Sequence, residues 1–463
     1  MYRPLVLVCV VLAGCATYQP RPIAPAQLSQ RFEERSLNSE TLHAWLERQP
    51  GHDAGRWPLP RWNREMLTLA AYYYSPALDI ARAQWGTAKA GIKAAGAMPN
   101  PSLQLPFEYT TNHQGAGRPY TTGPALDMPI ETAHKRGYRI DQAAQLSEAA
   151  RLNIGNEAWK VRGQVRDALL SLYAERERVA LLTLKAATQQ QIVDMVEKRR
   201  AVGEAAVPDV NQAFFALTEA QADLTSARNG LRNARSRLAS AIGLPVAAFD
   251  SVQFDLGEFE HPRPPPPPAV ARRAAIFHRA DLLGSLAEYA ATEAALQTEI
   301  ARQYPDIHIG PSYTYDVGAN KIGFGLAGIT LPIFDRNQGG IAQAEAKRTE
   351  AAARTAALQD TILNDLDRAF AHYQASVDTL HLSTLRLSTA QKQMDSQSAR
   401  FAVGAIDRLA LAQARANTQT SAMAHLDDVV AAQQAANALE DAMQMPLSPE
   451  TPDRTLTEKA ISR

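Results

Sequence analysis

Apolar and polar side chains alternate along the chain from Pro305 to Tyr315. A period of two is the signature of a β-strand with one apolar and one polar face. The polar face of this run carries His308, and its apolar face carries Ile307, Ile309, Tyr313 and Tyr315. A second run, Ile322 to Leu326, alternates large apolar residues with glycine. This pattern fits a soluble hairpin and also a pair of strands from an outer-membrane barrel, because each of these structures can have one apolar face with aromatic residues.

The same pattern occurs about 200 residues earlier in the chain. After Pro101, the same phase places four apolar side chains on one face: Leu103, Leu105, Phe107 and Tyr109. Pro101 precedes Pro305 by 204 residues, and Met128-Pro129-Ile130 precedes Leu331-Pro332-Ile333 by 203. We infer a tandem duplication in which each half reads helix, strand, strand, very long helix, glycine-containing turn and helix.

Two long segments without proline predict very long helices, one from about Thr132 to Ala201 and one from about Asn337 to Ala402. At about 1.5 Å per residue, each would be roughly 100 Å long. Between Val161 and Leu182, apolar residues recur at alternating spacings of four and three, which predicts a coiled-coil seam. A glycine turn follows each long helix, and return helices are expected from about Val207 to Ile242 and from about Arg408 to Met443.

The first 15 residues predict an export signal. Arg3 precedes a short apolar run, and the run ends on Leu12-Ala13-Gly14-Cys15. This ending resembles the bacterial lipoprotein lipobox, in which the cysteine is acylated and becomes the mature N-terminus; an ordinary signal with an incidental cysteine is the alternative. The residue after Cys15 is Ala16 rather than aspartate, which favours sorting to the outer membrane. The only other cysteine is Cys9, so the mature chain suits an oxidising compartment.

These patterns divide the chain into six parts: a leader (1–14), a lipidated linker (15–62), a first repeat (63–243), a proline-rich segment (244–272), a second repeat (273–446) and a tail (447–463). The linker contains three tryptophans and is expected to lie along a surface. The first repeat should open with a helix from Asn63 to about Ala97. Pro264 to Pro268 form a run that predicts a stiff polyproline spacer.

Four strands per chain are too few to close a barrel, and lipid does not tolerate an open sheet edge. Three copies would supply about 12 strands, an even number that suits an outer-membrane barrel. The expected fold is therefore mainly α with a membrane β-barrel: a trimeric channel-tunnel that continues into a tube of coiled coils. The apolar faces of the strands given above would then contact lipid.

Composition and motifs give no indication of catalysis. The net charge is zero, which does not favour nucleic-acid binding. The chain has no P-loop, G-x-S-x-G, H-E-x-x-H or C-x-x-C motif. No two histidines have the spacing of metal ligands on a common turn, and the nine methionines are not clustered. We expect no enzyme activity, no bound metal and no cofactor.

The segment Leu331-Pro332-Ile333-Phe334-Asp335-Arg336-Asn337-Gln338-Gly339-Gly340-Ile341 resembles the strand-to-helix junction of TolC-like outer membrane efflux proteins, most closely the heavy-metal branch. Asn100-Pro101-Ser102-Leu103 is similar to the start of that family's first strand. The resemblance covers nearly the whole mature chain. It implies a homotrimeric exit duct in the outer membrane of a Gram-negative bacterium, with the helices in the periplasm, a periplasmic adaptor and an inner-membrane transporter. A pore-less periplasmic adaptor or scaffold is the alternative, although such proteins do not repeat a unit of two strands and a long helix.

The resemblance also suggests roles for the helical turns. The turns at Val202-Gly203 and Val403-Gly404 correspond to the periplasmic tips that meet the adaptor, although each glycine also suits a simple helix C-cap. Asp407, and by analogy Asp209, correspond to residues near the constriction that closes the tunnel. Both aspartates also stand at the start of a return helix, where an N-cap is the alternative role. The cargo, whether metal cation, drug or other solute, is not specified by the sequence.

Overall fold

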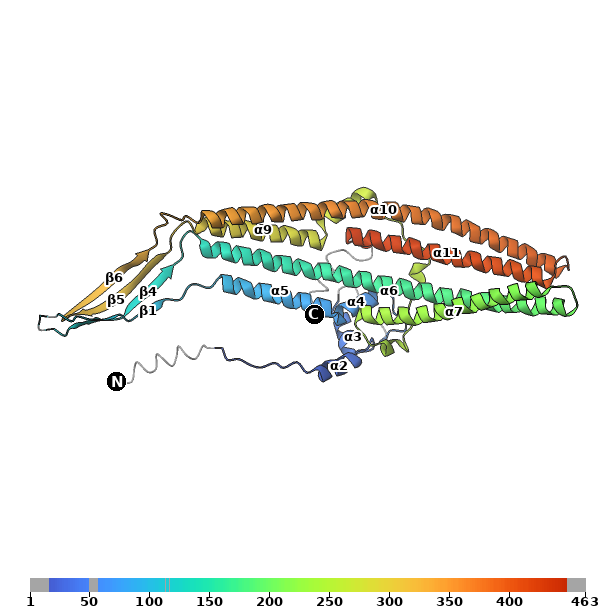
Figure 1. The fold of residues 1–463 in the computed structure, drawn as a ribbon, viewed down its shortest axis with the longest axis horizontal. Helices are drawn as coiled ribbons and strands as arrows, with labels where there is room; N and C mark the ends of the chain where they lie inside the picture. The colour runs from blue at the N-terminus through green and yellow to red at the C-terminus, as the bar shows by residue number, and fades with distance from the viewer. Residues whose placement is uncertain (1–15, 50–56, 113, 116, 448–463) are drawn as a thin grey trace.

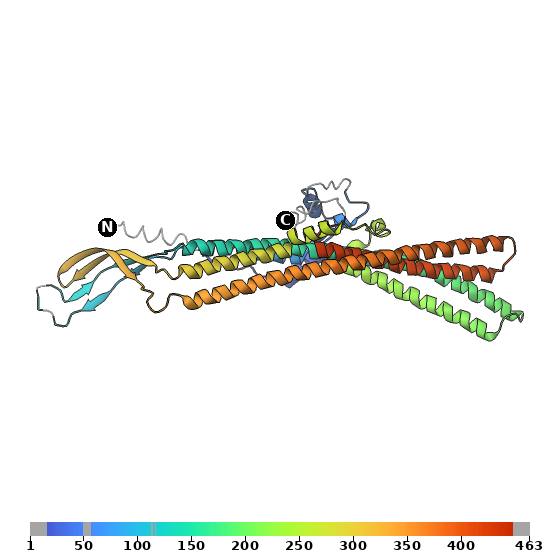
Figure 2. The same cartoon turned by 90° about the horizontal axis from the view of Figure 1, so that it is seen from above.

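The computed structural model describes residues 16–49, 57–112, 114–115 and 117–447 of the chain. The predicted leader and Cys15 lie outside these residues, as does nearly all of the predicted tail. The described part is an elongated body with a β-sheet at one end and two helical hairpin turns at the other (Figure 1). Seen from the perpendicular direction, the long helices run together near the sheet, and the two hairpins diverge toward their turns (Figure 2).

Four helices make most of the body: α6 (Lys135–Ala201), α7 (Val207–Ile242), α10 (Gln338–Ala402) and α11 (Arg408–Met443). The predicted long helices and return helices are confirmed, with starts within three residues of the expected ones. Two shorter helices, α5 (Pro76–Ala95) and α9 (Ala280–Ala301), accompany α6 and α10 toward the sheet (Figure 1). Among the described residues, none of the helices combines the length and the apolar character needed to cross a membrane.

The expected single helix from Asn63 to Ala97 is wrong. The segment forms two helices, α4 (Arg64–Tyr74) and α5, which are separated at Ser75. Ser75 precedes Pro76 and has an extended backbone, because a residue before proline avoids the helical region. The second repeat is built the same way, with α8 (Pro268–Phe277) before α9.

The sheet has six strand segments: β1 (Ser102–Gln104), β2 (Phe107–Tyr109), β3 (Tyr120–Thr122), β4 (Ala125–Ile130), β5 (Ile307–Asp316) and β6 (Ala319–Ile329). They form four antiparallel strands in chain order, because β1 and β2 pair with β4 and β3 respectively, β3 and β4 pair with β5, and β5 pairs with β6. The four expected strands are thus present, but the first two are each interrupted. Pro106 and Pro124 lie at the interruptions, where proline has no N–H to donate to the ladder.

The main hydrophobic core lies near the middle of the body, where α4 packs against α6 and α7. Trp45, on α3 (Glu40–Leu46), and Trp62 are buried in this core. The expectation that the linker lies along a surface is therefore wrong for this part, because two of its three tryptophans are core residues. A helix not expected from the sequence, α2 (Pro25–Glu33), precedes α3. Its first residue is proline, which is favourable at a helix start.

Between the repeats, two short 3₁₀ turns, η1 (Val246–Phe249) and η2 (Gly257–Phe259), place Phe249 and Phe259 in the same core. Only the last proline of the run, Pro268, is helical, as the first residue of α8.

Candidate functional site: the sheet and the helical tips

The pairing register gives the sheet one apolar and one polar face. Leu103 lies opposite Leu126, Met128 opposite Ile309, and Ile309 also opposite Leu326, so the large apolar residues of neighbouring strands share one face. The residues predicted to contact lipid all lie on this face. Many of its side chains are exposed, including Leu103, Leu105, Phe107, Tyr109, Tyr313, Ile322, Phe324 and Leu326. An exposed apolar surface of this extent indicates a contact with something other than water.

The opposite face of the sheet is polar. Thr121 donates to the Asp316 carboxylate over 2.9 Å, and Lys321 pairs with the same carboxylate. His308 Nδ1 lies 3.0 Å from the Asp127 carboxylate on the neighbouring strand. The polar side chains thus form bonds with one another across the strands, as on a surface that faces water.

Both outer edges of the sheet are unpaired within the described residues. The interrupted strand formed by β1 and β2 pairs only with its successor, and β6 pairs only with β5. Unpaired edges present a row of backbone donors and acceptors that favours pairing with another strand. The chain by itself therefore carries an incomplete sheet.

The junction between sheet and helices is held by polar contacts. The Lys135 ammonium, at the first residue of α6, lies 2.7 Å from both the Asp306 carboxylate and the Tyr304 carbonyl oxygen. Thr132 donates its backbone N–H to Asp306 over 3.0 Å and its hydroxyl to Pro305. These contacts join the first repeat's exit from the sheet to the second repeat's first strand, which fixes the sheet relative to the helices.

Both helical tips end at a glycine with a left-handed backbone. Gly203 has φ +83° and Gly404 has φ +75°, and in each case the following residue donates back across the last helical turn. This is the usual glycine ending of a helix, which explains why glycine is required there. Val202 and Val403, the residues proposed for adaptor contact, are 71% and 80% exposed, so both are free to meet a partner.

The two aspartates near the tips cap helices. Asp407 is the N-cap of α11, and its carboxylate accepts the Ala410 N–H over 2.8 Å. Asp209 lies in the first turn of α7 and accepts the Ala206 N–H over 2.8 Å. Asp407 also pairs with Arg199 of α6, which joins the two hairpins. The hydrogen bond from Ala410 and the pair with Arg199 hold the pKa of Asp407 below its ordinary value, so this carboxylate is charged at neutral pH.

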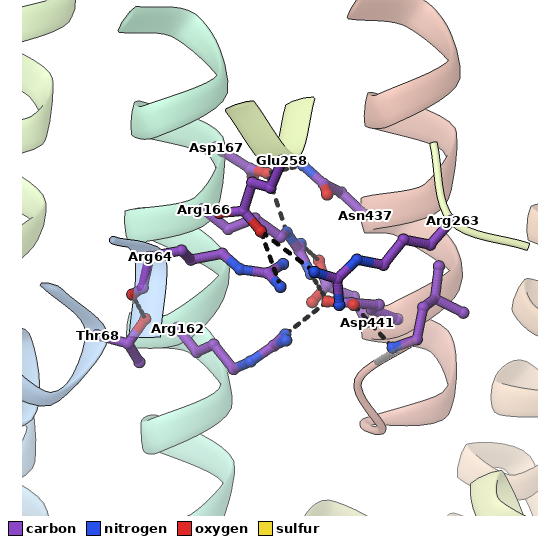
Figure 3. A network of polar contacts seen from close by, with 11 residues as sticks. Arg64, Thr68, Arg162, Arg166, Asp167, Glu258, Arg263, Asn437 and Asp441 are labelled. Atoms are coloured by element: carbon purple, nitrogen blue, oxygen red, sulfur yellow. Dashed lines mark hydrogen bonds and ion pairs between the residues drawn. The ribbon is translucent and has the colours of Figure 1, made fainter. Parts of the chain in front are cut away.

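A buried ionic cluster in the middle of the body was not anticipated from the sequence (Figure 3). Arg162 and Arg166 lie on successive turns of α6 and both donate to the Glu440 carboxylate of α11, over 2.6 and 2.8 Å. Arg166 also donates to Asp441 over 2.8 Å. The Arg166 side chain is fully buried and that of Glu440 is 5% exposed. The cluster therefore joins the first repeat to the second through paired, water-excluded charges.

Arg64 of α4 and Glu258 of η2 extend this cluster, with their charged groups 3.2 Å apart. Burial works against the charged form of Glu440, but Arg162 and Arg166 outweigh it and lower the pKa of Glu440 to about 2. A sequence signal did exist: two arginines four residues apart interrupt an apolar segment of α6, and Glu440-Asp441 interrupts an alanine-rich segment of α11. The partners are 274 and more residues apart, so the sequence did not show that they meet.

No group of three or more histidine, cysteine, aspartate or glutamate side chains could hold a metal ion in the part of the chain that the structure describes. The candidate site therefore consists of surfaces: the two-faced sheet with its open edges, and the exposed helical tips.

Comparison with known proteins matches the chain to a family described as outer membrane efflux protein, over residues 71–244 and 272–443, with one match in each half of the duplication. The chain is 28% identical over 375 residues to the cobalt-zinc-cadmium resistance protein CzcC of Cupriavidus metallidurans, which covers 77% of this chain and 86% of that relative. It is 25% identical over 256 residues to the pyoverdine export outer membrane protein OpmQ of Pseudomonas aeruginosa, covering 52% of each. The outer membrane protein VceC of Vibrio cholerae has a similar fold, with a TM-score of 0.67 at 19% identity over 83% of this chain and 97% of that one.

Proposed function

Because the chain belongs to the outer membrane efflux protein family, and is thus the outer membrane channel component of a tripartite efflux pump, we propose that it works as a passive exit duct. Channels of this family are homotrimers that work with a periplasmic adaptor and an inner-membrane transporter. The observation that carries the proposal is the sheet, which has an exposed apolar face, a polar face and two unpaired edges.

Three copies of this sheet complete one another. Four strands from each give a barrel of about 12 strands, which removes every open edge. The exposed apolar face, with Phe107, Tyr313 and Phe324, turns to lipid, and the polar face with His308 and Asp127 turns to a water-filled lumen. The long helices run away from the sheet (Figure 1), and in this proposal three copies of them continue the barrel into the periplasm as a tube.

The relatives are efflux channel proteins and not enzymes. We propose that this chain likewise performs no reaction. Two of its ionic contacts join parts of the structure: the Asp306 carboxylate is held by Lys135, and the buried Glu440 carboxylate by two arginines. Energy for transport then comes from the inner-membrane transporter, and this chain supplies the path across the outer membrane.

We propose heavy-metal cations of the cobalt, zinc and cadmium group as the cargo of the pump. CzcC, whose name includes these metals, matches over 77% of this chain, whereas the pyoverdine exporter OpmQ matches over 52%. The exposed tips at Val202-Gly203 and Val403-Gly404 are the proposed contact with the adaptor, and Asp407 the proposed charge near the constriction.

Two measurements test this function. Protein extracted in mild detergent should have the mass of three chains and retain its β-sheet signal in circular dichroism; a monomer with an intact sheet would rule out the shared barrel. Cells that lack this chain should accumulate more zinc, cobalt or cadmium than wild type when challenged with each metal. Unchanged metal content combined with increased sensitivity to an organic solute would leave the duct standing and reject the metal cargo.

A further inference from the structure

The internal duplication provides a residue-by-residue correspondence between the two halves. Leu103 pairs with Leu126 in the first hairpin, and Ile307 pairs with Ile329 in the second. The first strands thus correspond at a separation of 204 residues, and the second strands at 203 on the helix side of the register shift that lies between His308 and Ile309. The helix starts agree, because His134 and Asn337, also 203 residues apart, both have φ 61° and both precede a long helix. The correspondence therefore holds in the structure as well as in the sequence.

Within one chain, the two repeats meet along a seam of known register. β4 of the first repeat pairs with β5 of the second, with Met128 opposite Ile309 and Ile130 opposite Ile307. Directly below these pairs, Lys135 contacts Asp306. In a closed ring of three chains, repeats alternate, so each chain's second repeat must in turn meet the first repeat of the next chain.

Resting on the trimeric duct proposed above, we infer how the second repeat of one copy pairs with the first repeat of the next copy. The strands that meet there have the same register as the corresponding strands where the two repeats meet within one copy. Replacing each residue by its counterpart places Leu331 of one copy opposite Leu105 of the next, and Ile333 opposite Leu103. All four of these side chains are exposed in the single chain, by 62% to 69%.

The burial of their counterparts supports this assignment. Met128, Ile307 and Ile309 are only partly exposed, because they already lie in the seam within the chain, and Ile130 is 45% exposed, less than its counterpart Ile333 at 67%. Near Leu331 the single chain instead forms a tight turn, in which Ile333 donates its N–H to the Leu331 carbonyl over 2.9 Å. This turn must open for the segment to pair, as its counterpart Met128-Pro129-Ile130 already does within β4.

The helices show the same difference between buried residues in the contact within one chain and exposed counterparts elsewhere. α9 packs against both α6 and α10, which buries a row of small side chains, Ala287, Ala291 and Ala294, to 7% exposure or less. The counterparts on α5, at the same separation of 204, are exposed: Ala83, Thr87 and Ala90. By the transferred geometry, this face of α5 packs against α10 of the neighbouring copy. Small side chains there allow the two helices to approach as closely as α9 approaches α6 within one chain.

One feature of the seam within one copy has no counterpart in the seam between copies. The counterparts of Lys135 and Asp306 are Gln338 and Ser102, so the seam between copies lacks the partly buried ion pair of the seam within a copy. Backbone pairing and apolar contact hold that seam instead. The double substitution Ser102→Asp with Gln338→Lys should therefore add a missing contact. It should raise the temperature at which the trimer dissociates in SDS, whereas each single substitution should not.

Disulfide crosslinking tests the register directly. Residues directly opposite one another in an antiparallel pair have Cα atoms about 4.5–5.5 Å apart, within the range of a disulfide. The cysteine pairs Leu105→Cys with Leu331→Cys and Leu103→Cys with Ile333→Cys should each give a covalent trimer on a non-reducing gel, reversed by reductant. The swapped pairs, Leu103→Cys with Leu331→Cys and Leu105→Cys with Ile333→Cys, use the same four positions two residues out of register and should not crosslink.

Two controls complete the design. Met128→Cys with Ile309→Cys should form a disulfide within one chain and leave the monomer mass, which shows that the oxidation works at a known register. Each single cysteine variant shows whether Cys15 takes part. If the swapped pairs crosslink, the register is wrong. The register is also wrong if no pair crosslinks in a protein that is trimeric in detergent. Either result would leave the duct function intact. A monomeric protein would instead contradict the proposed function, and the register with it.

Discussion

Replacing Glu440 with glutamine should destabilise the protein by removing one carboxylate from between two buried arginines. The Glu440 side chain is 5% exposed, and Arg162 and Arg166 donate to it over 2.6 and 2.8 Å. Glutamine has nearly the same shape but no charge, so Arg162 would lose its carboxylate partner and Arg166 would keep only Asp441, without a large cavity being formed. Removing one member of a buried ion pair typically costs about 3–5 kcal/mol, because an uncompensated charge stays buried.

The pKa of Glu440 gives a second magnitude from the same contacts. The pKa of Glu440 is lowered from 4.5 to about 2, because the two arginines outweigh the effect of burial. At about 1.4 kcal/mol per pKa unit, this corresponds to roughly 3 kcal/mol of stability at neutral pH. A carboxyl group with a lowered pKa contributes stability that is present above its ordinary pKa and lost as the pH falls through the folded value. The contribution of Glu440 should therefore disappear between about pH 4.5 and pH 2.

The assay compares thermal unfolding of wild type and Glu440→Gln in the same detergent at the same protein concentration, at pH 7 and pH 3. We expect a large loss of stability at pH 7 and a smaller one at pH 3. Asp167→Asn is the matched control, because Asp167 lies beside the cluster but is 63% exposed, and its loss should cost less than about 1 kcal/mol. Equal stability of Glu440→Gln and wild type at pH 7 would refute the conclusion that this cluster holds the two repeats together.

Three further predictions concern the membrane, the tip and the anchor. Phe107→Lys should reduce the amount of protein in the outer-membrane fraction, because lysine on a lipid face costs about 2–4 kcal/mol near mid-membrane. Gln104→Lys, on the polar face, should not reduce it. Equal insertion of the two variants would reject the assignment of the faces. Asp407→Asn should lower cation selectivity and weaken block by multivalent cations in planar bilayers, with thermal stability nearly unchanged, because asparagine caps a helix well. Unchanged selectivity would leave Asp407 as a cap and partner of Arg199 only. Cys15→Ser should abolish incorporation of a labelled fatty-acid analogue, and persistent labelling would show the lipobox interpretation to be wrong.

The long helices and the strand faces were predictable because they depend on local periodicity. α7 and α11 match their expected bounds, since each has a capping aspartate at its start, Asp209 or Asp407, and α7 ends at Gly243, which has a positive φ. The apolar alternation after Pro305 likewise predicted β5. A strand with one face against an apolar environment has alternating apolar and polar residues, whether that environment is a protein core or lipid.

Features that depend on distant partners were not predictable in this way. Trp62 was assigned to a surface linker, but it is in the core because its backbone bonds to Gln253 and Asp255, in the segment between the repeats. The pairing of Arg166 with Glu440 depends on the packing of α6 against α11, which a single sequence does not show. The break at Ser75-Pro76 had a local signal, since proline restricts the residue before it, but the alanine-rich pattern on both sides concealed it.

Ion conductance of the purified protein in a planar lipid bilayer tests the central claim most directly. A duct formed by three copies should produce discrete, reproducible conductance steps, one for each trimer inserted, while a preparation of Phe107→Lys that fails to insert should produce none. Protein that is demonstrably trimeric and inserted in the bilayer, yet conducts no ions under any applied voltage or salt concentration, would contradict the conclusion that this chain forms a channel.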